Sequence, residues 1–157
     1  MKTANESIWS EPFPIDLVEQ MSAGCMLGHL GIAITEAGND YLKGRMPVDS
    51  RTRQPAGVLH GGASVVLAET LASWAATFTV DRSRYYCVGL EINANHIRAA
   101  KDGFVHGIAR PIHRGRTTQI WEVRISDDRD RLVCISRVTM AVLDKPSEYG
   151  LPGGNDS

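Results

Sequence analysis

The sequence lacks the patterns that mark disulfide, metal or serine-hydrolase chemistry. Its three cysteines, Cys25, Cys87 and Cys134, are far apart and form no Cys-x-x-Cys pair. We therefore interpret them as reduced core thiols of a cytosolic protein. Neither His-Glu-x-x-His nor Gly-x-Ser-x-Gly occurs, so zinc hydrolysis and a serine nucleophile on a strand–helix turn have no support. We expect no metal and no cofactor.

The sequence also has little net charge and no apolar run of membrane-spanning length. The formal net charge of −1 provides no basic surface for nucleic acid. Residues 1–14 hold no basic start followed by an apolar run, so we expect no secretory signal, no membrane partner and a cytoplasmic location. With 43% hydrophobic residues, the length suits one globular domain.

What the sequence does contain is a long apolar stretch that follows a histidine and begins with two glycines. From Gly61 to Val80 the residues are small or apolar, apart from serine and threonine hydroxyls and one acid, Glu69. A helix that is apolar nearly all round is a buried helix. Burying a lone carboxylate is costly, which points to a catalytic role for Glu69. The alternative is a structural carboxylate that pairs with an arginine across an interface.

Hydrophobic periodicity predicts a sheet around this helix. Residues 15–23 can form a short amphipathic helix that Gly24 ends. We expect strands at residues 30–35, 41–48, 85–98, 103–110, 117–126 and 132–143. Several antiparallel strands and one long apolar helix predict an α+β domain, with a curved antiparallel sheet wrapped around a long central helix.

The predicted domain has a flanking segment at each end. Residues 1–24 are expected to form an N-terminal arm and short helix, with residues 1–14 loose. Residues 25–144 form the domain itself. Residues 145–157, which are rich in proline and glycine, are expected to be a flexible C-terminal tail.

Four sequence blocks occur in a characteristic order. They are Met46 to Thr52, the Gln-Pro-x-Gly-x-x-His-Gly-Gly-Ala stretch from Gln54 with its Ala-Glu-Thr, Gly89 to His96, and Pro111 to Arg116. Together they resemble the hotdog-fold acyl-CoA thioesterases. Within that family they look more like the Arthrobacter-type 4-hydroxybenzoyl-CoA thioesterase branch, which includes the dihydroxynaphthoyl-CoA thioesterase of menaquinone synthesis and the proofreading thioesterase of enterobactin synthesis.

The resemblance implies a hotdog fold and a thioester hydrolase. It implies hydrolysis of an aromatic or medium-chain acyl-CoA to free acid and CoA, with CoA as part of the substrate. An acyl carrier protein is the alternative acyl donor. It also implies a homodimer that assembles into a homotetramer, in which each active site takes its acid from one chain and its CoA contacts from the other.

The resemblance assigns roles to the central helix. Glu69 aligns with the catalytic acid of the family, as nucleophile or general base. Ser73 lies four residues later on the same face and assists the acid or the water, although its hydroxyl could instead bond its own helix carbonyl. The Gly61 N–H lacks an intrahelical partner and suits a developing oxyanion. Tight packing of the helix start would explain Gly61 and Gly62 equally well.

Two residues before the helix complete the predicted catalytic group. His60 could transfer protons, but we favour a neutral ring bonded to backbone that shapes the oxyanion site, because Glu69 is the more direct base. By resemblance Gln54 orients the thioester or water, and the alternative is an exposed loop amide.

The phosphates of CoA suit arginine side chains, and the resemblance assigns a CoA channel. Its residues are Gly89, His96, Ile97, Arg98, Ala99, His113, Arg114, Gly115, Arg116, Thr117 and Thr118. Any one of these arginines could instead be a solvated surface charge. Trp74 stands where relatives carry Met or Val beside the acyl pocket, so it could shorten that pocket or stack on an aromatic acyl group.

Two other functions compete with hydrolysis. A hotdog dehydratase carries its catalytic histidine well upstream of the helix acid, and residues 49–58 contain no histidine. A non-catalytic hotdog sensor that binds acyl-CoA has no need for Glu69 together with Ser73 and Gln54, so their presence argues against it.

Overall fold

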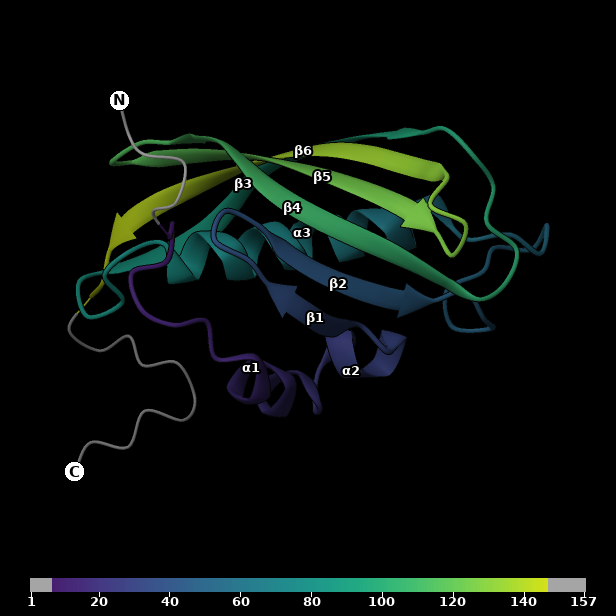
Figure 1. Cartoon of the computed structure of the whole chain (residues 1–157), viewed down its shortest axis with the longest axis horizontal. Helices are drawn as coiled ribbons and strands as arrows, with labels where there is room; N and C mark the ends of the chain where they lie inside the picture. The colour runs from purple at the N-terminus through teal and green to yellow at the C-terminus, as the bar shows by residue number, and fades with distance from the viewer. Residues whose placement is uncertain (1–6, 147–157) are drawn as a thin grey trace.

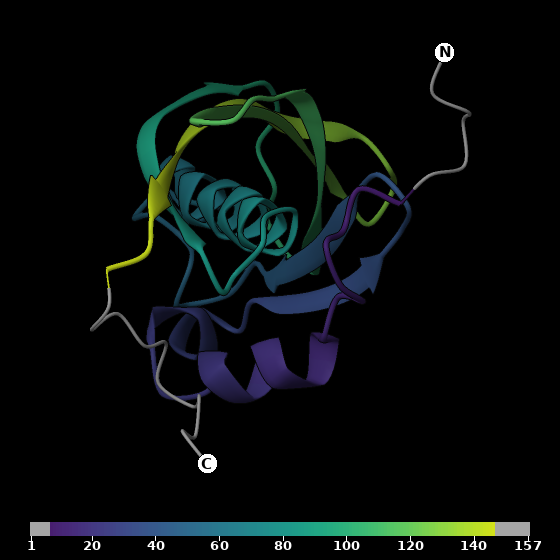
Figure 2. The ribbon, with the colours of Figure 1, turned by 90° about the vertical axis from the view of Figure 1, so that its left-hand side faces the viewer.

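The computed structural model of the chain describes residues 7–146 and shows one curved sheet around one long helix (Figure 1). The elements are α1 (Ile15–Ser22), α2 (Met26–Leu30), β1 (Ala33–Ala37), β2 (Leu42–Pro47), α3 (Gly61–Phe78), β3 (Tyr85–His96), β4 (Phe104–Arg114), β5 (Thr118–Asp127) and β6 (Leu132–Asp144). The six strands are antiparallel in the order β1-β2-β4-β5-β6-β3. Figure 2 shows the sheet curving around α3, with α1 and α2 beyond β1. The predicted α+β architecture is confirmed.

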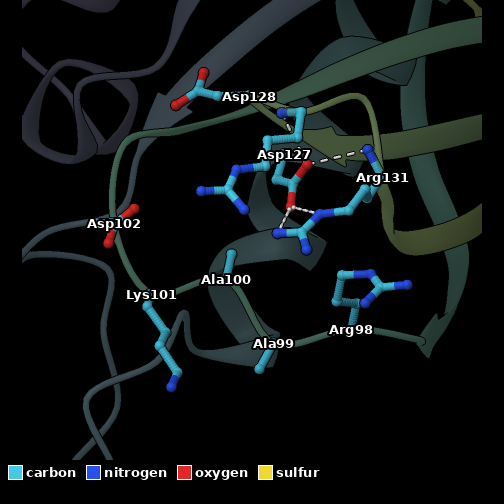
Figure 3. Close-up of a pocket in the computed structure, with 9 residues that line it drawn as sticks. Arg98, Ala99, Ala100, Lys101, Asp102, Asp127, Asp128 and Arg131 are labelled. Atoms are coloured by element: carbon cyan, nitrogen blue, oxygen red, sulfur yellow. Dashed lines mark hydrogen bonds and ion pairs between the residues drawn. The ribbon is translucent and has the colours of Figure 1, made fainter.

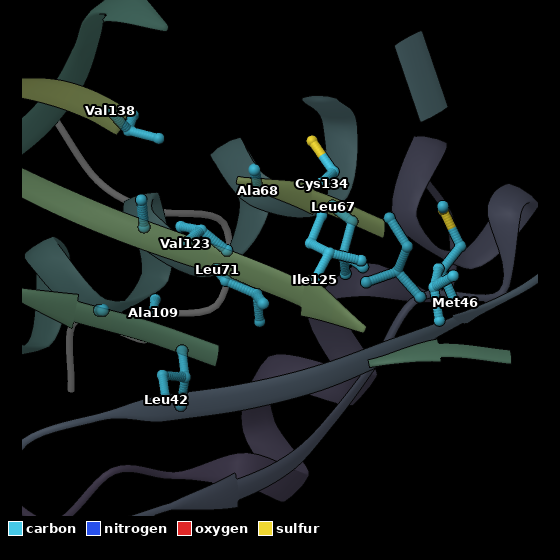
Figure 4. Packing of buried hydrophobic residues seen from close by; sticks show 14 of the residues in the cluster. Leu42, Met46, Leu67, Ala68, Leu71, Ala109, Val123, Ile125, Cys134 and Val138 are labelled. Atoms are coloured by element: carbon cyan, nitrogen blue, oxygen red, sulfur yellow. The ribbon is translucent and has the colours of Figure 1, made fainter. Parts of the chain in front are cut away.

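The core lies between α3 and the concave face of the sheet. Leu67 and Leu71 project from α3 toward Leu42, Val123 and Ile125 of the sheet, and none of these side chains is exposed (Figure 4). Full burial of each such side chain contributes about 1.5–3 kcal/mol. This packing fixes α3 against the sheet, and with it the direction in which the start of the helix points.

The N-terminal segment is bonded to the end of α3. The Ser10 N–H donates to the Phe78 carbonyl at 2.9 Å, and the Ser10 hydroxyl bonds the carbonyls of Phe78 and Val80. The Trp9 indole N–H donates to the Gly38 carbonyl at 2.6 Å. The expectation of a loose arm is therefore wrong for residues 7–14, because they satisfy carbonyls that a helix end leaves unpaired. Residues 1–6, and residues 147–157 of the predicted tail, lie outside the described residues.

Two element boundaries differ from the prediction by more than two residues. Residues 26–30 form the short helix α2, so the first strand begins at Ala33 rather than at Leu30. The strand predicted to end at Arg110 continues to Arg114 through Pro111. Pairing of β4 with β2 stops at residue 109, so Pro111 lies where one side of β4 is free and its missing N–H breaks no pair there.

The three cysteines occupy different environments. Cys134 is buried and Cys87 is partly buried, whereas Cys25 is exposed at the start of α2, so the core interpretation is wrong for Cys25. Burial raises the pKa of the Cys87 thiol to about 11. Within residues 7–146, no helix is both long enough and apolar enough to cross a membrane.

Candidate active site

A cavity of about 350 Å³ opens at the N-terminal end of α3. It collects six of the residues predicted from the sequence: Gln54, Gly61, His96, Ile97, Arg98 and Ala99. The loop before α3 and the end of β3 therefore meet here, although they are far apart in the sequence. This is the strongest convergence of the predicted residues in one chain.

The start of α3 leaves one backbone donor free. The Nδ1 atom of His60 accepts the Gly62 N–H at 2.8 Å, and the His60 carbonyl accepts the Ala63 N–H at 2.9 Å. Among the described residues no acceptor bonds the Gly61 N–H. His60 thus acts as the helix cap, with its ring hydrogen on Nε2 when neutral. The free N–H of Gly61 and the helix dipole favour negative charge at this point.

Two glycines let side chains lie directly against the backbone. A Cβ atom on Gly61 would lie 2.8 Å from His96 Nε2, so the His96 ring covers the helix start. A Cβ atom on Gly89 would lie 2.6 Å from Glu69 Oε1, so the Glu69 carboxylate rests on β3. The β3–β6 register shifts between Gly89 and Glu91, and such bulges often redirect side chains beside active sites.

Glu69 itself is exposed in the single chain. The expectation of a buried carboxylate is therefore wrong for one chain alone. The physical reason is topological: β3 forms the edge of the sheet, and Glu69 lies on the side of α3 that faces this edge. Any burial of Glu69 needs something beyond the single chain.

Ser73 and Trp74 lie further along α3 and do not line the cavity at Gly61. The Ser73 hydroxyl approaches Met140 Sδ of β6 at 3.9 Å rather than the helix carbonyl proposed as an alternative. The Trp74 ring stacks on Phe78, with ring centroids 6.1 Å apart.

Other predicted residues stay apart within one chain. Gly61 and Glu69 are eight residues apart on α3, which corresponds to about 12 Å along the helix axis. His96 pairs with Cys134, whereas Thr118 pairs with Ala141, seven residues further along β6 and about 23 Å away at the rise of a strand. The predicted CoA segments 96–99 and 113–118 therefore lie toward opposite ends of the sheet.

The sequence analysis did not predict four residues that line the cavity: Val58, Leu59, Ser64 and Val133. The position of Ser64 could have been predicted, because it lies one helical turn after Gly61 and therefore on the same helix face. Val133 had none, since its position depends on the pairing of β3 with β6. Within the described residues, no group of three or more His, Cys, Asp or Glu side chains is placed to hold a metal ion.

Comparison with known proteins identifies the family. The model of the Thioesterase superfamily matches residues 56–134, about half of the chain, from the loop before α3 to the start of β6. The chain belongs to the thioesterase superfamily. The matched part of this thioesterase includes the whole cavity except Gln54.

Relatives in several bacteria share most of the length of this thioesterase. It is 46% identical to 1,4-dihydroxy-2-naphthoyl-CoA hydrolase of Escherichia coli over 136 aligned residues. The aligned region covers 87% of this chain and 99% of that protein. It is also 46% identical to the proofreading thioesterase EntH of Cronobacter sakazakii, over 87% of this chain and 98% of that protein. The crystal structure of a mutant thioesterase from Pseudomonas aeruginosa superposes with a TM-score of 0.88 at 47% identity, covering 88% of this chain and 100% of the other. The predicted family, the hotdog fold and thioester hydrolysis are confirmed.

Proposed function

We propose that this thioesterase hydrolyses acyl-CoA with an aromatic or medium-chain acyl group, releasing the free acid and CoA. The observation that carries the proposal is the unbonded Gly61 N–H, which faces a cavity that also holds Gln54. A fixed backbone donor of this kind stabilises the oxyanion of acyl transfer. The name of the Escherichia coli relative specifies a naphthoyl-CoA substrate, which supports the aromatic class. CoA arrives as part of the substrate, so no separate cofactor is needed.

In the proposed reaction the thioester oxygen accepts a hydrogen bond from Gly61, and the Gln54 amide orients the thioester or the water. Glu69 either takes a proton from the attacking water or attacks the carbonyl carbon itself. The carbon–sulfur bond then breaks, and CoA leaves as the thiolate. Where Glu69 is the nucleophile, this leaves a mixed anhydride between Glu69 and the acyl group, which a water molecule hydrolyses to the free acid and the restored carboxylate. Ser73, one turn after Glu69, holds the acid or the water, while His60 keeps the helix start in shape through its bond to Gly62.

The activity is tested by measuring the release of free thiol from benzoyl-CoA. Glu69→Gln keeps the size of the side chain but removes its basicity, so kcat should fall by about 100-fold or more. Glu122→Gln, on β5 with a single long ion pair of 3.9 Å to Arg124, is the matched control and should turn over normally. Near wild-type turnover by folded Glu69→Gln would remove Glu69 from the mechanism. No thiol release by the wild type from any of a panel of acyl-CoA and acyl-carrier-protein thioesters would refute the activity.

We further propose that the active unit is a homodimer, assembled into a homotetramer. The 12 Å estimated between Gly61 and Glu69 along the helix is too long for both to act on one carbonyl group. The edge of β3 is unpaired in the single chain, and Leu90 on it is 63% exposed. Unpaired edges are usually covered, and a second copy joined at β3 would cover both this edge and Glu69.

Subunit mixing tests the shared site. Glu69→Gln chains and His60→Ala chains are each expected to be weakly active alone. If Glu69 serves a site whose His60 belongs to the other subunit, mixed dimers regain about half of the sites, because one site per dimer then has both native residues. No recovery would place both residues in the same chain, and a fully active monomer in sedimentation would refute the shared site.

A further inference from the structure

Ser64 is a buried side chain of the cavity at Gly61 whose hydrogen-bonding capacity is unused. It lies three residues after Gly61 on α3, lines the same cavity and is only 1% exposed. Within residues 7–146, its hydroxyl group makes no hydrogen bond. Buried hydroxyl groups are nearly always bonded, because leaving one unbonded costs free energy. Packing alone does not account for a serine here, since alanine would fill the position without an unbonded hydroxyl.

The Ser64 hydroxyl is not used by its own helix. A buried serine in a helix commonly donates to the carbonyl one turn earlier, as Ser22 of α1 does to Val18 at 2.7 Å. The His60 carbonyl, at the equivalent position for Ser64, accepts backbone N–H groups and no hydroxyl in the described part of the chain. Among the described residues, Arg82 Nε is the unbonded side-chain atom that is completely sealed, so the Ser64 oxygen is in contact with the open space of the cavity.

The geometry of α3 directs this hydroxyl toward the turn that begins at Gly61. Residues three apart lie on the same face of a helix, and each Cα–Cβ bond tilts toward the N-terminus of its helix. The Ser64 side chain therefore extends back over the first turn, where the Gly61 N–H is also unbonded. The other walls of the cavity are largely apolar, with the side chains of Val58, Leu59, Ile97 and Val133. A few polar donors in an apolar hollow are typical of a site that orients one group of a ligand.

A second, charged cavity of about 330 Å³ shows which part of the site is exposed. The two cavities share Arg98 and Ala99, and the charged one lies between the loop that follows β3 and the turn between β5 and β6 (Figure 3). Its Lys101 and Arg129 side chains are exposed. Ser64 does not line the charged cavity and belongs to the buried part of the site. A buried place with neutral donors suits a neutral carbonyl group better than a charged group.

We propose that the Ser64 hydroxyl is a second hydrogen-bond donor to the thioester carbonyl oxygen, beside the Gly61 N–H. The proposal rests on the acyl-CoA hydrolysis proposed above. A carbonyl oxygen has two lone pairs, so the Gly61 N–H alone leaves one of them without a partner. A fixed donor to the second lone pair binds more strongly as negative charge develops on the oxygen. The carbonyl group in turn supplies the partner that the Ser64 hydroxyl lacks in the free protein.

In this role Ser64 donates a hydrogen bond and keeps its proton. A serine nucleophile needs a base within hydrogen-bond reach. Within the described residues, the Ser64 hydroxyl bonds no base, and the Nδ1 atom of His60 is occupied by the Gly62 N–H. Attack on the carbonyl carbon therefore remains with water or Glu69, and no covalent bond to Ser64 forms or breaks.

Ser64→Ala separates this role from a structural one. The kcat for benzoyl-CoA should fall about 100-fold with little change in KM, because the lost bond is strongest in the transition state. The midpoint of urea unfolding should not fall, because alanine is favoured in helices and the variant removes an unbonded buried hydroxyl. Ser22→Ala, at a buried serine of α1 that does not line the cavity, is the matched control and should keep the wild-type kcat.

Two analogues that cannot be hydrolysed test the assignment to the carbonyl oxygen without turnover. In the ketone analogue of benzoyl-CoA, a methylene group replaces the thioester sulfur, whereas S-benzyl-CoA lacks the carbonyl oxygen. Calorimetry should show that Ser64→Ala binds the ketone about fivefold more weakly than the wild type does, the effect of one neutral hydrogen bond. Its affinity for S-benzyl-CoA should equal that of the wild type.

The outcomes separate this proposal from the proposed function. If the wild type hydrolyses benzoyl-CoA and Ser64→Ala keeps the wild-type kcat and ketone affinity, the second donor is overturned while thioesterase activity stands. A fall in kcat together with a fall in the unfolding midpoint would overturn it in favour of a packing role. An equal loss of affinity for both analogues would also overturn it, since the hydroxyl would then contact another part of the ligand. If no acyl-CoA is hydrolysed but binding of the ketone alone still depends on Ser64, the proposed activity fails and the donor remains.

Discussion

The two ends of α3 are built differently. At the C-terminal end, the carbonyls of Ala76, Phe78 and Val80 accept hydrogen bonds from Thr79 and Ser10. At the N-terminal end, His60 accepts the N–H groups of Gly62, Ala63 and Ser64, whereas the N–H group of Gly61 has no acceptor among the described residues and lies beside a cavity. The same helix therefore has one end closed by the chain itself and one end left open to a ligand.

The difference extends to the side chains around each end. Aromatic rings close the C-terminal end: Phe78 lies 4.8 Å from Phe13 and 6.1 Å from Trp74, between ring centroids. Free cations surround the N-terminal end, where Arg98 and Lys101 have no partner within the described residues. Substitutions at the closed end should therefore change stability, and those at the open end should change catalysis.

Phe78→Ala should give the largest effect. Phe78 is 1% exposed, and removing such a ring from a core costs about 3–5 kcal/mol in the free energy of unfolding. Urea unfolding followed by circular dichroism measures this loss, and Leu17→Ala on α1 is the control, because Leu17 is 41% exposed. Turnover per folded molecule should change only a few-fold. A loss of less than 1 kcal/mol would mean that these aromatic rings do not hold the closed end together.

Gly61→Ala should lower kcat strongly and change the free energy of unfolding little, the reverse of Phe78→Ala. The new Cβ atom would lie 2.8 Å from His96 Nε2, so the ring or the helix start must move, and the geometry of the free N–H is lost. Loss of one oxyanion donor lowers kcat by about 100-fold, which corresponds to about 2.7 kcal/mol in the transition state. Unfolding in urea should change little by comparison. Thiol release from benzoyl-CoA gives the answer, and unchanged kcat would show that Gly61 does not bind the oxyanion.

Much of this contrast could be predicted from the sequence, but not all of it. The apolar run after His60 defined α3, and alternation along residues 41–48 predicted β2, whose buried residues Leu42, Gly44 and Met46 share one face. These features are local, so periodicity and capping reveal them. The bonds of Ser10 to Phe78 could not be predicted, because they join residues far apart in the sequence and no local pattern marks them.

The charged cavity shows the same limit. Residues 127–130 form a charged segment between two predicted strands, and no local sequence pattern places them beside Lys101. The pairing of β3 with β6, rather than with β4, brings them there. Likewise, the exposure of Glu69 follows from β3 being an edge strand. No local pattern marks this edge, and only the dimer that the family resemblance implies predicts that residues 85–98 are open to a partner. The sequence therefore assigns residues to helices and strands, but it does not show which strands become neighbours, because that depends on long-range pairing.

Ser10→Ala should have the smallest effect on stability of the substitutions at the closed end. The substitution removes two hydroxyl bonds, of 3.0 Å to the Phe78 carbonyl and 2.8 Å to the Val80 carbonyl, but keeps the backbone bond to Phe78. We expect a loss of about 1 kcal/mol in the free energy of unfolding, the typical net contribution of such bonds. Ser50→Ala, an exposed loop serine, should have almost no effect. Because α3 places Phe78 about 25 Å from Gly61, kcat should stay at the wild-type value in both variants. A fall in kcat for Ser10→Ala without a fall in stability would show that the two ends of α3 are coupled, and that the closed end helps to position the open one.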